Sequence, residues 1–437
     1  MDKIIAFALG TQAAGEINQI KGAFGAIQEL TGDSFDVDDA FLLPADVKSV
    51  DDLRRKMLFS EYSSYNKFKA DIYGCLDTYM KKSKIIPRIF VVAYSQAENE
   101  YAGSNVDAVC RAVKEYYDEN KLGFILTSVL TSKLHKYKYV DLVNAPKHLL
   151  TLNSRIRYLQ HKSIKKRALI TVGTINNFSL QKVKQKKEDL MNMIKKYSRN
   201  AELKPAVQKL KDFCKAEKRV VFCLGGRVNG SEVIFDVNYA GKLLSDAEKL
   251  TRIGYNVVFC NGPRTPNDVT DYLYEKTLNN SKILFQNCKK IAEDDSERTI
   301  SSWRIYSGRN EEKFKVLEKM GNIYPGVLGF ENTLVVHTFD SYSSCETAGA
   351  AIPTAISSQG LYIDPNVRYD CHNLQKLLCP KYAIDWDDFV NMACNMKIEP
   401  KDLNPLVLSS PLRVFAETCL NRIISMGKRK ITKKKIN

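Results

Sequence analysis

The sequence predicts an α/β protein in which two Rossmann-like domains face each other across a cleft and are followed by C-terminal helices. Its 437 residues exceed what one hydrophobic core usually organises. Strand-like and helix-like segments alternate along the chain, stop at a Lys-rich stretch and then start again. The expected division is 1–180 for the N-terminal domain, 181–218 for a basic helical connector, 219–410 for the C-terminal domain and 411–437 for a helix with a basic tail.

The first half shows the alternation that βαβ units produce. Apolar residues spaced by three and four positions, from Ile17 to Leu30, predict a helix directly after a β-favouring run. Strands are expected at 3–9, 34–43, 88–94, 122–129, 139–143 and 168–172, and helices at 17–30, 65–80 and 105–117. Such alternation predicts a parallel sheet with helices on both faces.

The second half repeats the pattern after a polar, mostly helical stretch that Pro205 interrupts. Strands are expected at 219–224, 255–260, 282–286, 333–338 and 353–356. Helices are expected at 235–253, 269–278 and 342–350, and then at 371–378, 386–394 and 411–426. Ligands are expected in the cleft, at the carboxyl ends of the strands.

The positive charge is concentrated in two segments. The net charge is +16; residues 181–219 contain 13 basic and 5 acidic residues, and 428–437 contain 6 basic and no acidic residues. A nucleic-acid-binding face would spread basic residues among aromatic ones, so a nucleic-acid partner is not expected. Two interpretations stay open: a solvated helix with a solubilising tail, or attachment of the connector and tail to an anionic membrane surface.

The composition excludes several other classes of protein. Hydrophobic residues make up 44% and charged residues 27%, as in ordinary globular chains. No apolar run reaches the roughly 18 residues of a membrane span, and the start resembles no secretory signal, so a cytoplasmic location, including a membrane face reached from there, is expected. The 11 cysteines form no CxxC pair and the 5 histidines no zinc-type pair, so neither a metal nor a cofactor is expected.

The first strand runs through a glycine-containing turn into a helix. Glycines let the turn close and leave backbone N–H groups at the helix N-terminus, where an anionic or polar ligand group fits. A plain strand-to-helix turn is the alternative, because the spacing matches neither a dinucleotide fingerprint nor a P-loop. The candidate cleft residues of this half are Gly10, Thr11, Gln12, Gly15, Asn18 and Gln19.

The second half carries candidate phosphate-binding groups after two of its strands. Gly225 and Gly226 permit close backbone approach, and the guanidinium of Arg227 suits phosphate oxygens. Arg264 and Thr265 stand between two prolines, on a stiff loop that suits a planar cation holding a diphosphate. A tight turn and a surface arginine are the respective alternatives.

A third strand of this half delivers polar residues to a helix. The hydroxyl and N–H groups of Asp340, Ser341 and Ser343 are placed to bind phosphate oxygens. Glu346, one turn later, is placed to accept hydrogen bonds from ribose hydroxyls. The alternative is N-capping by Asp340 or Ser341, with Glu346 as the capping-box partner.

The order of these motifs resembles the mitochondrial-fission Elm family, which is itself similar to GT-B glycosyltransferases. The resemblance extends over about residues 3–360, and it is carried by 16–19, 140–148, 169–173, 225–226, 264–266 and 340–353. It implies a GT-B-like fold in which the second half holds a nucleotide-sugar donor and the first half an acceptor. On matching positions it implies donor contacts from Gly225, Gly226, Arg264, Ser341, Ser343 and Glu346.

The chemistry expected of such a protein is metal-independent. A general base deprotonates the acceptor, and basic groups stabilise the departing diphosphate. His148, which follows Pro146 at a strand end, is the expected base, and a core histidine is the alternative. Two functions stay open: a glycosyltransferase that acts on an envelope or lipid-linked acceptor, or a non-catalytic adaptor that recruits partners to a membrane, as implied by the resemblance.

Overall fold

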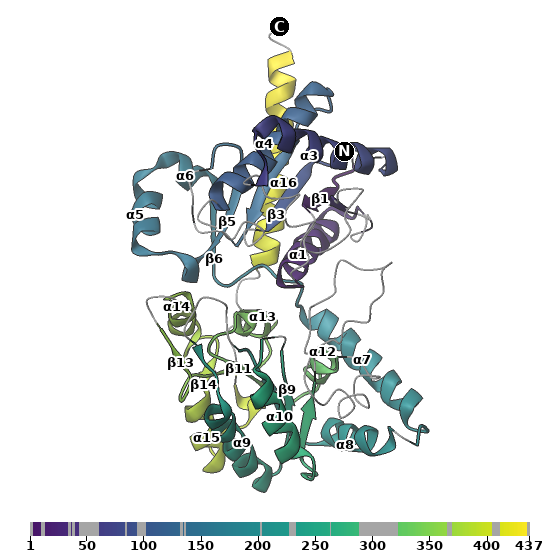
Figure 1. The fold of residues 1–437 in the computed structure, drawn as a ribbon, viewed down its shortest axis with the longest axis vertical. Helices are drawn as coiled ribbons and strands as arrows, with labels where there is room; N and C mark the ends of the chain where they lie inside the picture. The colour runs from purple at the N-terminus through teal and green to yellow at the C-terminus, as the bar shows by residue number, and fades with distance from the viewer. Residues whose placement is uncertain are drawn as a thin grey trace. The chain divides into compact units, whose positions relative to one another are not determined.

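In the computed structural model the chain folds into two compact α/β units, each built on its own sheet (Figure 1). Unit 1 holds residues 1–177, 299–301 and 409–437, and unit 2 holds residues 178–298 and 302–408. The structure describes residues 3–9, 14–33, 36, 40–42, 61–83, 85–93, 102–131, 134, 137–201, 203–226, 233–262, 264–287, 322–364, 369–403 and 411–434.

Unit 1 contains a parallel sheet with the strand order β2-β1-β3-β4-β5-β6. The strands are β1 (Ala6–Leu9), β2 (Phe41–Leu42), β3 (Ile89–Ala93), β4 (Leu126–Leu130), β5 (Leu142–Pro146) and β6 (Ala168–Thr171). Phe7 and Leu9 face α3 (Tyr65–Lys82) and α4 (Ala102–Glu119). Ala6 and Ala8 face α1 (Ala14–Thr31) and α16 (Pro411–Lys434). Because side chains alternate along a strand, both faces of the sheet are covered by helices.

Three short helices connect β5 to β6 in unit 1. They are η3 (Lys147–Leu149), α5 (Leu152–Gln160) and α6 (Lys162–Arg167). In the view of Figure 1, α5 and α6 lie beyond the β6 edge of the sheet.

Unit 2 contains a second parallel sheet with the order β10-β9-β7-β11-β12-β14. The strands are β7 (Lys218–Cys223), β9 (Tyr255–Cys260), β10 (Ile283–Gln286), β11 (Thr333–Thr338), β12 (Thr354–Ser357) and β14 (Ile384–Asp385). An antiparallel pair of short strands, β8 (Val233–Ile234) and β13 (Tyr362–Ile363), accompanies it.

Helices cover both faces of this second sheet as well. One face packs against α7 (Leu180–Tyr197), α8 (Lys204–Lys215) and α12 (Tyr324–Val327). On the other face Phe222 stacks on Phe259, with ring centroids 4.4 Å apart, and meets Trp386 edge-on at 5.0 Å. The remaining helices are α9 (Val237–Arg252), α10 (Asn267–Thr277), α13 (Ser343–Gly349), α14 (Tyr369–Leu378), α15 (Trp386–Cys394) and η4 (Pro400–Asp402).

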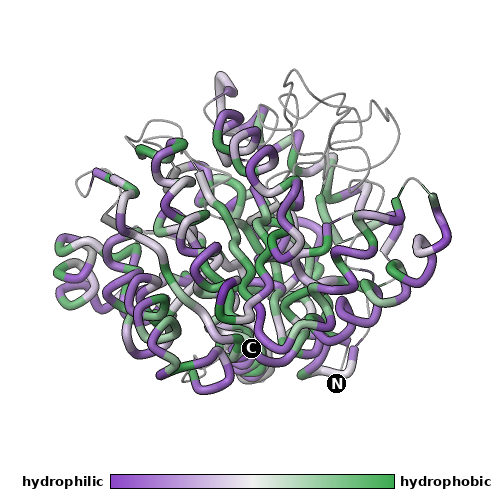
Figure 2. The backbone as a smooth tube through the Cα atoms, turned by 90° about the horizontal axis from the view of Figure 1, so that it is seen from below, coloured by the Kyte–Doolittle hydropathy of each residue, from purple (hydrophilic) through white to green (hydrophobic). Residues whose placement is uncertain are grey.

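The prediction of two Rossmann-like α/β domains with C-terminal helices is confirmed. Figure 2 shows the strands as largely hydrophobic, with helices of mixed hydropathy around them. The strand predicted at 139–143 lies instead at Leu142–Pro146, because Leu142 and Val143 pair with β4 and the residues up to Pro146 pair with β6. Of the strand predicted at 34–43, the described residues form only β2.

The basic segment at 181–218 is part of unit 2. Its helices α7 and α8 bury Val183, Leu190, Val207 and Phe213 in the core of that unit. Pro205 does not interrupt a helix but stands at the start of α8, where its missing N–H costs nothing. The C-terminal helix α16 packs on α1 of unit 1. None of the helices in the described part of the chain combines the length and apolar character needed to cross a bilayer.

Candidate functional site

The strand order of unit 2 places a topological switch point between β7 and β11. From β7 the chain continues to β9 on one side, and from β11 it continues to β12 on the other side. Connections that leave in opposite directions open a crevice at the carboxyl ends of the two strands, and this is where ligands bind in open α/β sheets. The segments there are Gly225-Gly226, after β7, and 339–341, after β11.

Asp340 joins these two segments. Its buried carboxylate accepts the Gly226 N–H at 2.8 Å and the Thr338 hydroxyl at 2.7 Å, and the Thr338 oxygen accepts the Gly225 N–H at 2.8 Å. The N–H groups of both predicted glycines thus donate to protein groups, and a contact of Gly225 and Gly226 with a nucleotide-sugar stays a prediction. Thr338 was not predicted; its only signal in the sequence is its position at the end of a buried strand.

Close packing explains why two adjacent glycines stand after β7. A Cβ atom on Gly225 would lie 2.2 Å from an Asp340 carboxylate oxygen. A Cβ atom on Gly226 would lie 1.8 Å from the backbone oxygen of Arg264. Any side chain at these positions would force the neighbouring segments apart. Glycine is therefore required, because the loops come too close to leave room for a Cβ atom.

The loop after β9 brings Arg264 to the same place. The Thr265 hydroxyl donates to the Gly225 carbonyl at 2.7 Å and accepts the Gly262 N–H at 2.9 Å, which fixes the loop against β7. The Arg264 guanidinium lies 3.5 Å from the Asp340 carboxylate, yet 43% of its side chain is exposed. Burial raises the pKa of Asp340, and the nearby guanidinium opposes that shift. The arrangement presents an anchored, solvent-accessible cation at the switch point.

The polar residues before α13 mainly stabilise their own turn. The Ser341 hydroxyl accepts the Ser343 N–H at 3.2 Å, and the Ser341 N–H donates to the Thr338 carbonyl at 3.0 Å. The N-cap residue of α13 is Tyr342, without a side-chain cap, so the capping-box alternative is wrong. The N-cap of α10 is Pro266, also without a side-chain cap.

Glu346 is a half-buried carboxyl group on α13. Burial alone raises its pKa to about 7, and no described residue offers its carboxylate a hydrogen bond or an ion pair. It lies close to Tyr324, whose pKa is raised by burial and by the neighbouring Cys223 and Glu346. Tyr324 also lies near Cys223, which is the last residue of β7. Glu346 is therefore near the carboxyl end of that strand. Tyr324 and Cys223 were not predicted as site residues, and no sequence pattern marks them.

Unit 1 has a neutral polar network at the carboxyl ends of its strands. The Thr131 hydroxyl donates to the Gln19 side-chain oxygen at 2.7 Å. The Asn144 side chain accepts the Thr131 N–H at 3.2 Å and donates to the Thr171 hydroxyl at 3.1 Å. Sequence reasoning found Gln19 and missed the other three, although Asn144 lies within one of the segments that carry the resemblance.

The other predicted residues of unit 1 are distributed differently. Asn18 is exposed on α1, and Gly15 lies within the same helix. Gly10, Thr11 and Gln12 lie outside the described residues, as does Arg227 of unit 2.

His148 lies in η3, directly after β5, and only 1% of it is exposed. Burial lowers its pKa to about 4, so the imidazole is neutral at pH 7. This environment favours the core-histidine alternative, and the role of general base stays a prediction. Within the described ranges, no group of three or more His, Cys, Asp or Glu side chains is placed to hold a metal ion.

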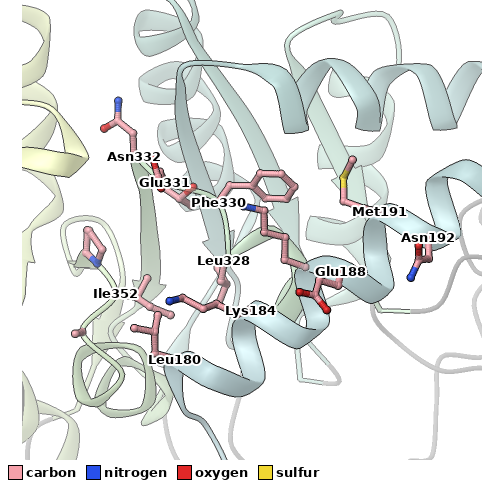
Figure 3. A pocket seen from close by; sticks show the side chains of 15 residues that line it. Leu180, Lys184, Glu188, Met191, Asn192, Leu328, Phe330, Glu331, Asn332 and Ile352 are labelled. Carbon is pink, nitrogen blue, oxygen red and sulfur yellow. The ribbon is translucent and has the colours of Figure 1, made fainter.

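A pocket of about 700 Å³ lies elsewhere in unit 2. One wall is α7, with Lys184 and Glu188, and another is the segment that contains Leu328 and Phe330 (Figure 3). Its lining also includes Thr333, at the amino end of β11. The pocket is therefore at the opposite end of that strand from Asp340 and Arg264, and the two places are separate.

Three solved structures show a distant likeness to this chain over nearly its whole length. The UDP-GlcNAc 2-epimerase of Methanocaldococcus jannaschii, in complex with UDP-GlcNAc and UDP, is 13% identical, with a TM-score of 0.41 over 97% of this chain and 99% of that one. The Neisseria meningitidis epimerase bound to UDP-GlcNAc is 12% identical, with a TM-score of 0.41 over 97% and 100%. The α,α-trehalose 6-phosphate synthase of Burkholderia multivorans is 10% identical, with a TM-score of 0.41 over 98% and 100%.

No protein-family model matches the chain, and no curated protein does. The resemblance to the Elm family therefore stays a prediction. The fold itself is established by the two parallel sheets and their helices.

Proposed function

We propose that this chain is a GT-B-like glycosyltransferase that works in the cytoplasm. Unit 2 binds a nucleotide-sugar, and the sugar is transferred to an envelope or lipid-linked acceptor without a metal ion. The observation that carries the proposal is the Arg264 guanidinium, held beside the β7–β11 switch point by Asp340 and still 43% exposed. Arginine binds diphosphate oxygens through a planar pair of N–H donors, and this suits the leaving group of such a reaction.

The chemistry assigned to Arg264 is stabilisation of the departing diphosphate. Negative charge grows on the bridging oxygen as the sugar leaves, and a cation that is already in place lowers the energy of that state. Asp340 is a positioning residue, because its two carboxylate oxygens accept the Gly226 N–H and the Thr338 hydroxyl. Thr265 positions the same loop through the Gly225 carbonyl.

Glu346 is proposed to accept hydrogen bonds from the ribose hydroxyls of the donor. A carboxylate is the usual acceptor for such a hydroxyl pair, and no described residue competes for this one. With a pKa of about 7, the carboxyl group is half ionised at neutral pH. Nucleotide affinity is therefore expected to rise between pH 6 and pH 8.

His148 remains the predicted general base for the acceptor hydroxyl. Its neutral imidazole has a nitrogen lone pair for the proton, but a pKa of about 4 makes it a weak base. An experiment can distinguish a general base at His148 from a histidine that only packs in the core. His148→Gln should abolish transfer with unchanged donor binding if the imidazole is the base, whereas a core histidine would change only the melting temperature.

The proposal is tested by thermal-shift measurements with UDP-, GDP-, ADP- and CMP-sugars on the full chain. One nucleotide class should raise the melting temperature, and the shift should disappear in Arg264→Ala. Arg252→Ala is the matched control, since this exposed arginine lies on α9 of the same unit and should bind as the wild type does. No shift with any nucleotide-sugar would contradict the transferase and leave the adaptor function implied by the resemblance.

A further inference from the structure

Helix α5 of unit 1 turns its large apolar side chains toward solvent. Leu152 is 73% exposed, Leu159 is 72% exposed and Ile156 is 40% exposed. Their spacing of four and three residues places all three on one side of the helix. Most large apolar side chains of the described chain are buried, so this continuous stripe is a marked exception.

The opposite side of α5 fixes this orientation. Tyr158 packs against the core formed with α3 and α4. Leu150, before the helix, and Ile164, in α6, are both buried in the same core. The helix is thus anchored at its inner side and at both ends, and turning the stripe inward would expose these anchors instead.

The surroundings of the stripe are purely cationic. Residues 147–167 contain no Asp or Glu. They contain seven basic residues, namely Lys147, Arg155, Arg157, Lys162, Lys165, Lys166 and Arg167. Arg155, Lys162, Lys165 and Lys166 are exposed, and no described acidic side chain pairs with them.

Three kinds of partner are compatible with exposed apolar groups, and the charge distinguishes them. A second copy of the same face would bring like charges together, which disfavours self-association. Nucleic acid stacks its bases on aromatic rings, but the exposed stripe is aliphatic. A bilayer with anionic lipids satisfies both features, because its headgroups attract the cations while its acyl boundary accepts Leu and Ile side chains.

We propose that α5 and α6 form a docking surface for anionic membranes, with Leu152, Ile156 and Leu159 inserted at the headgroup level. The surface lies on α5 and α6, and thus differs from the basic connector at 181–218 and the basic tail that the sequence suggested for membrane attachment. It does not rest on nucleotide-sugar binding. Vesicle binding and nucleotide binding can therefore fail separately.

Helix α7 provides a matched control surface. It exposes Leu180, at 46%, and Met191, at 44%, and it carries exposed lysines such as Lys195 and Lys196. It also carries acidic residues, and Lys186 is paired with Asp189 at 3.1 Å. It thus offers similar residue types without the purely cationic surroundings.

The test is flotation of the full chain with vesicles of phosphatidylcholine containing about 30% phosphatidylglycerol, against pure phosphatidylcholine. The wild type should float only with the anionic vesicles, and less as salt is raised. Leu152→Ser with Leu159→Ser, or Lys162→Glu with Lys165→Glu, should reduce binding by about tenfold or more. Leu180→Ser with Met191→Ser, and Lys195→Glu with Lys196→Glu, should bind as the wild type does. All four variants should retain the wild-type melting temperature, because the changed side chains are exposed.

Insertion itself is read from Leu159→Trp. The emission of this residue, taken as the difference from the wild type because the chain already contains two tryptophans, should shift to shorter wavelength with anionic vesicles and be quenched by brominated acyl chains. Wild-type protein that fails to float, equal losses in the α5 and α7 variants, or an unquenched tryptophan would each overturn the proposal. A change of solution mass in the Leu152→Ser, Leu159→Ser variant without any vesicle binding would do so too, by identifying a protein interface.

Discussion

Among the described residues, the hydrogen-bonded groups at the carboxyl ends of the two parallel sheets differ in charge. In unit 2, Arg264 and Asp340 form an ion pair between the β7 and β11 segments, and the guanidinium is accessible to solvent. In unit 1, the corresponding network of Gln19, Thr131 and Asn144 contains only neutral amide and hydroxyl groups. Similar backbone architecture thus presents a cation in one unit and neutral hydrogen-bonding groups in the other. The first suits a diphosphate, and the second suits a hydroxylated acceptor.

The largest effect on stability is expected from Gly226→Ala, because the added methyl group disrupts the packing of the loop that carries Arg264. The added Cβ would lie 1.8 Å from the Arg264 backbone oxygen, so the two loops must separate. We expect a loss of about 3 kcal/mol or more in the free energy of unfolding. Urea titration measures it.

Gly349→Ala is the control for that substitution. No atom lies within 4 Å of the position a Cβ would take, and Gly349 is helical. Its free energy of unfolding should stay within about 1 kcal/mol of the wild type. Equal losses in the two variants would show that the contact between the β7 and β9 loops is not tight.

An intermediate effect is expected from Glu346→Gln, and it depends on pH. Because burial raises the folded-state pKa from 4.5 to about 7, the folded protein holds its proton more tightly than the unfolded chain. Wild-type stability therefore falls as pH rises between these values. At pH 8 the variant should be more stable than the wild type by up to about 3 kcal/mol, and at pH 4 the difference should vanish. Urea titrations at both pH values measure this difference in the free energy of unfolding between variant and wild type. An equal difference at pH 4 and pH 8 would show that the Glu346 carboxyl group does not have a raised pKa.

The smallest effect is expected from Gln19→Ala in unit 1. It removes the acceptor of the Thr131 hydroxyl, which is worth about 1 kcal/mol in the free energy of unfolding. Nucleotide binding should be unchanged, because the residue belongs to the neutral network. Reduced nucleotide affinity in this variant would remove the distinction between the two sheets.

The pattern of apolar residues along the chain predicted correctly those strands whose bounds coincide with an apolar run. The strands at Tyr255–Cys260 and Thr333–Thr338 have the predicted bounds, because each is an apolar run that ends at polar residues. The strand at Leu142–Pro146 was misplaced, since its bounds depend on pairing with β4 and β6, which are distant in the sequence. Helix α5 was not predicted, although Leu152, Ile156 and Leu159 have helical spacing, and the exposure of these side chains depends on tertiary packing.

The sequence predicted individual residues of the candidate site in unit 2, but not the contacts that join them. Strand ends followed by glycines, Arg264 and Asp340 were visible in the sequence, because such residues stand out after an apolar run. Their connections were not visible, since the Gly226 N–H and its acceptor, Asp340, are separated by 114 residues. Burial of His148 and of Glu346 likewise depends on tertiary packing, which no spacing of residues encodes.

Isothermal titration calorimetry with UDP, GDP and ADP, on the wild type, Arg264→Ala and Gln19→Ala, measures whether Arg264 holds a diphosphate. We expect one of these nucleotides to bind the wild type saturably, to lose about tenfold or more in affinity for Arg264→Ala, and to keep its wild-type affinity for Gln19→Ala. A nucleotide that binds the wild type and Arg264→Ala equally well would show that the guanidinium at the β7–β11 switch point holds no diphosphate.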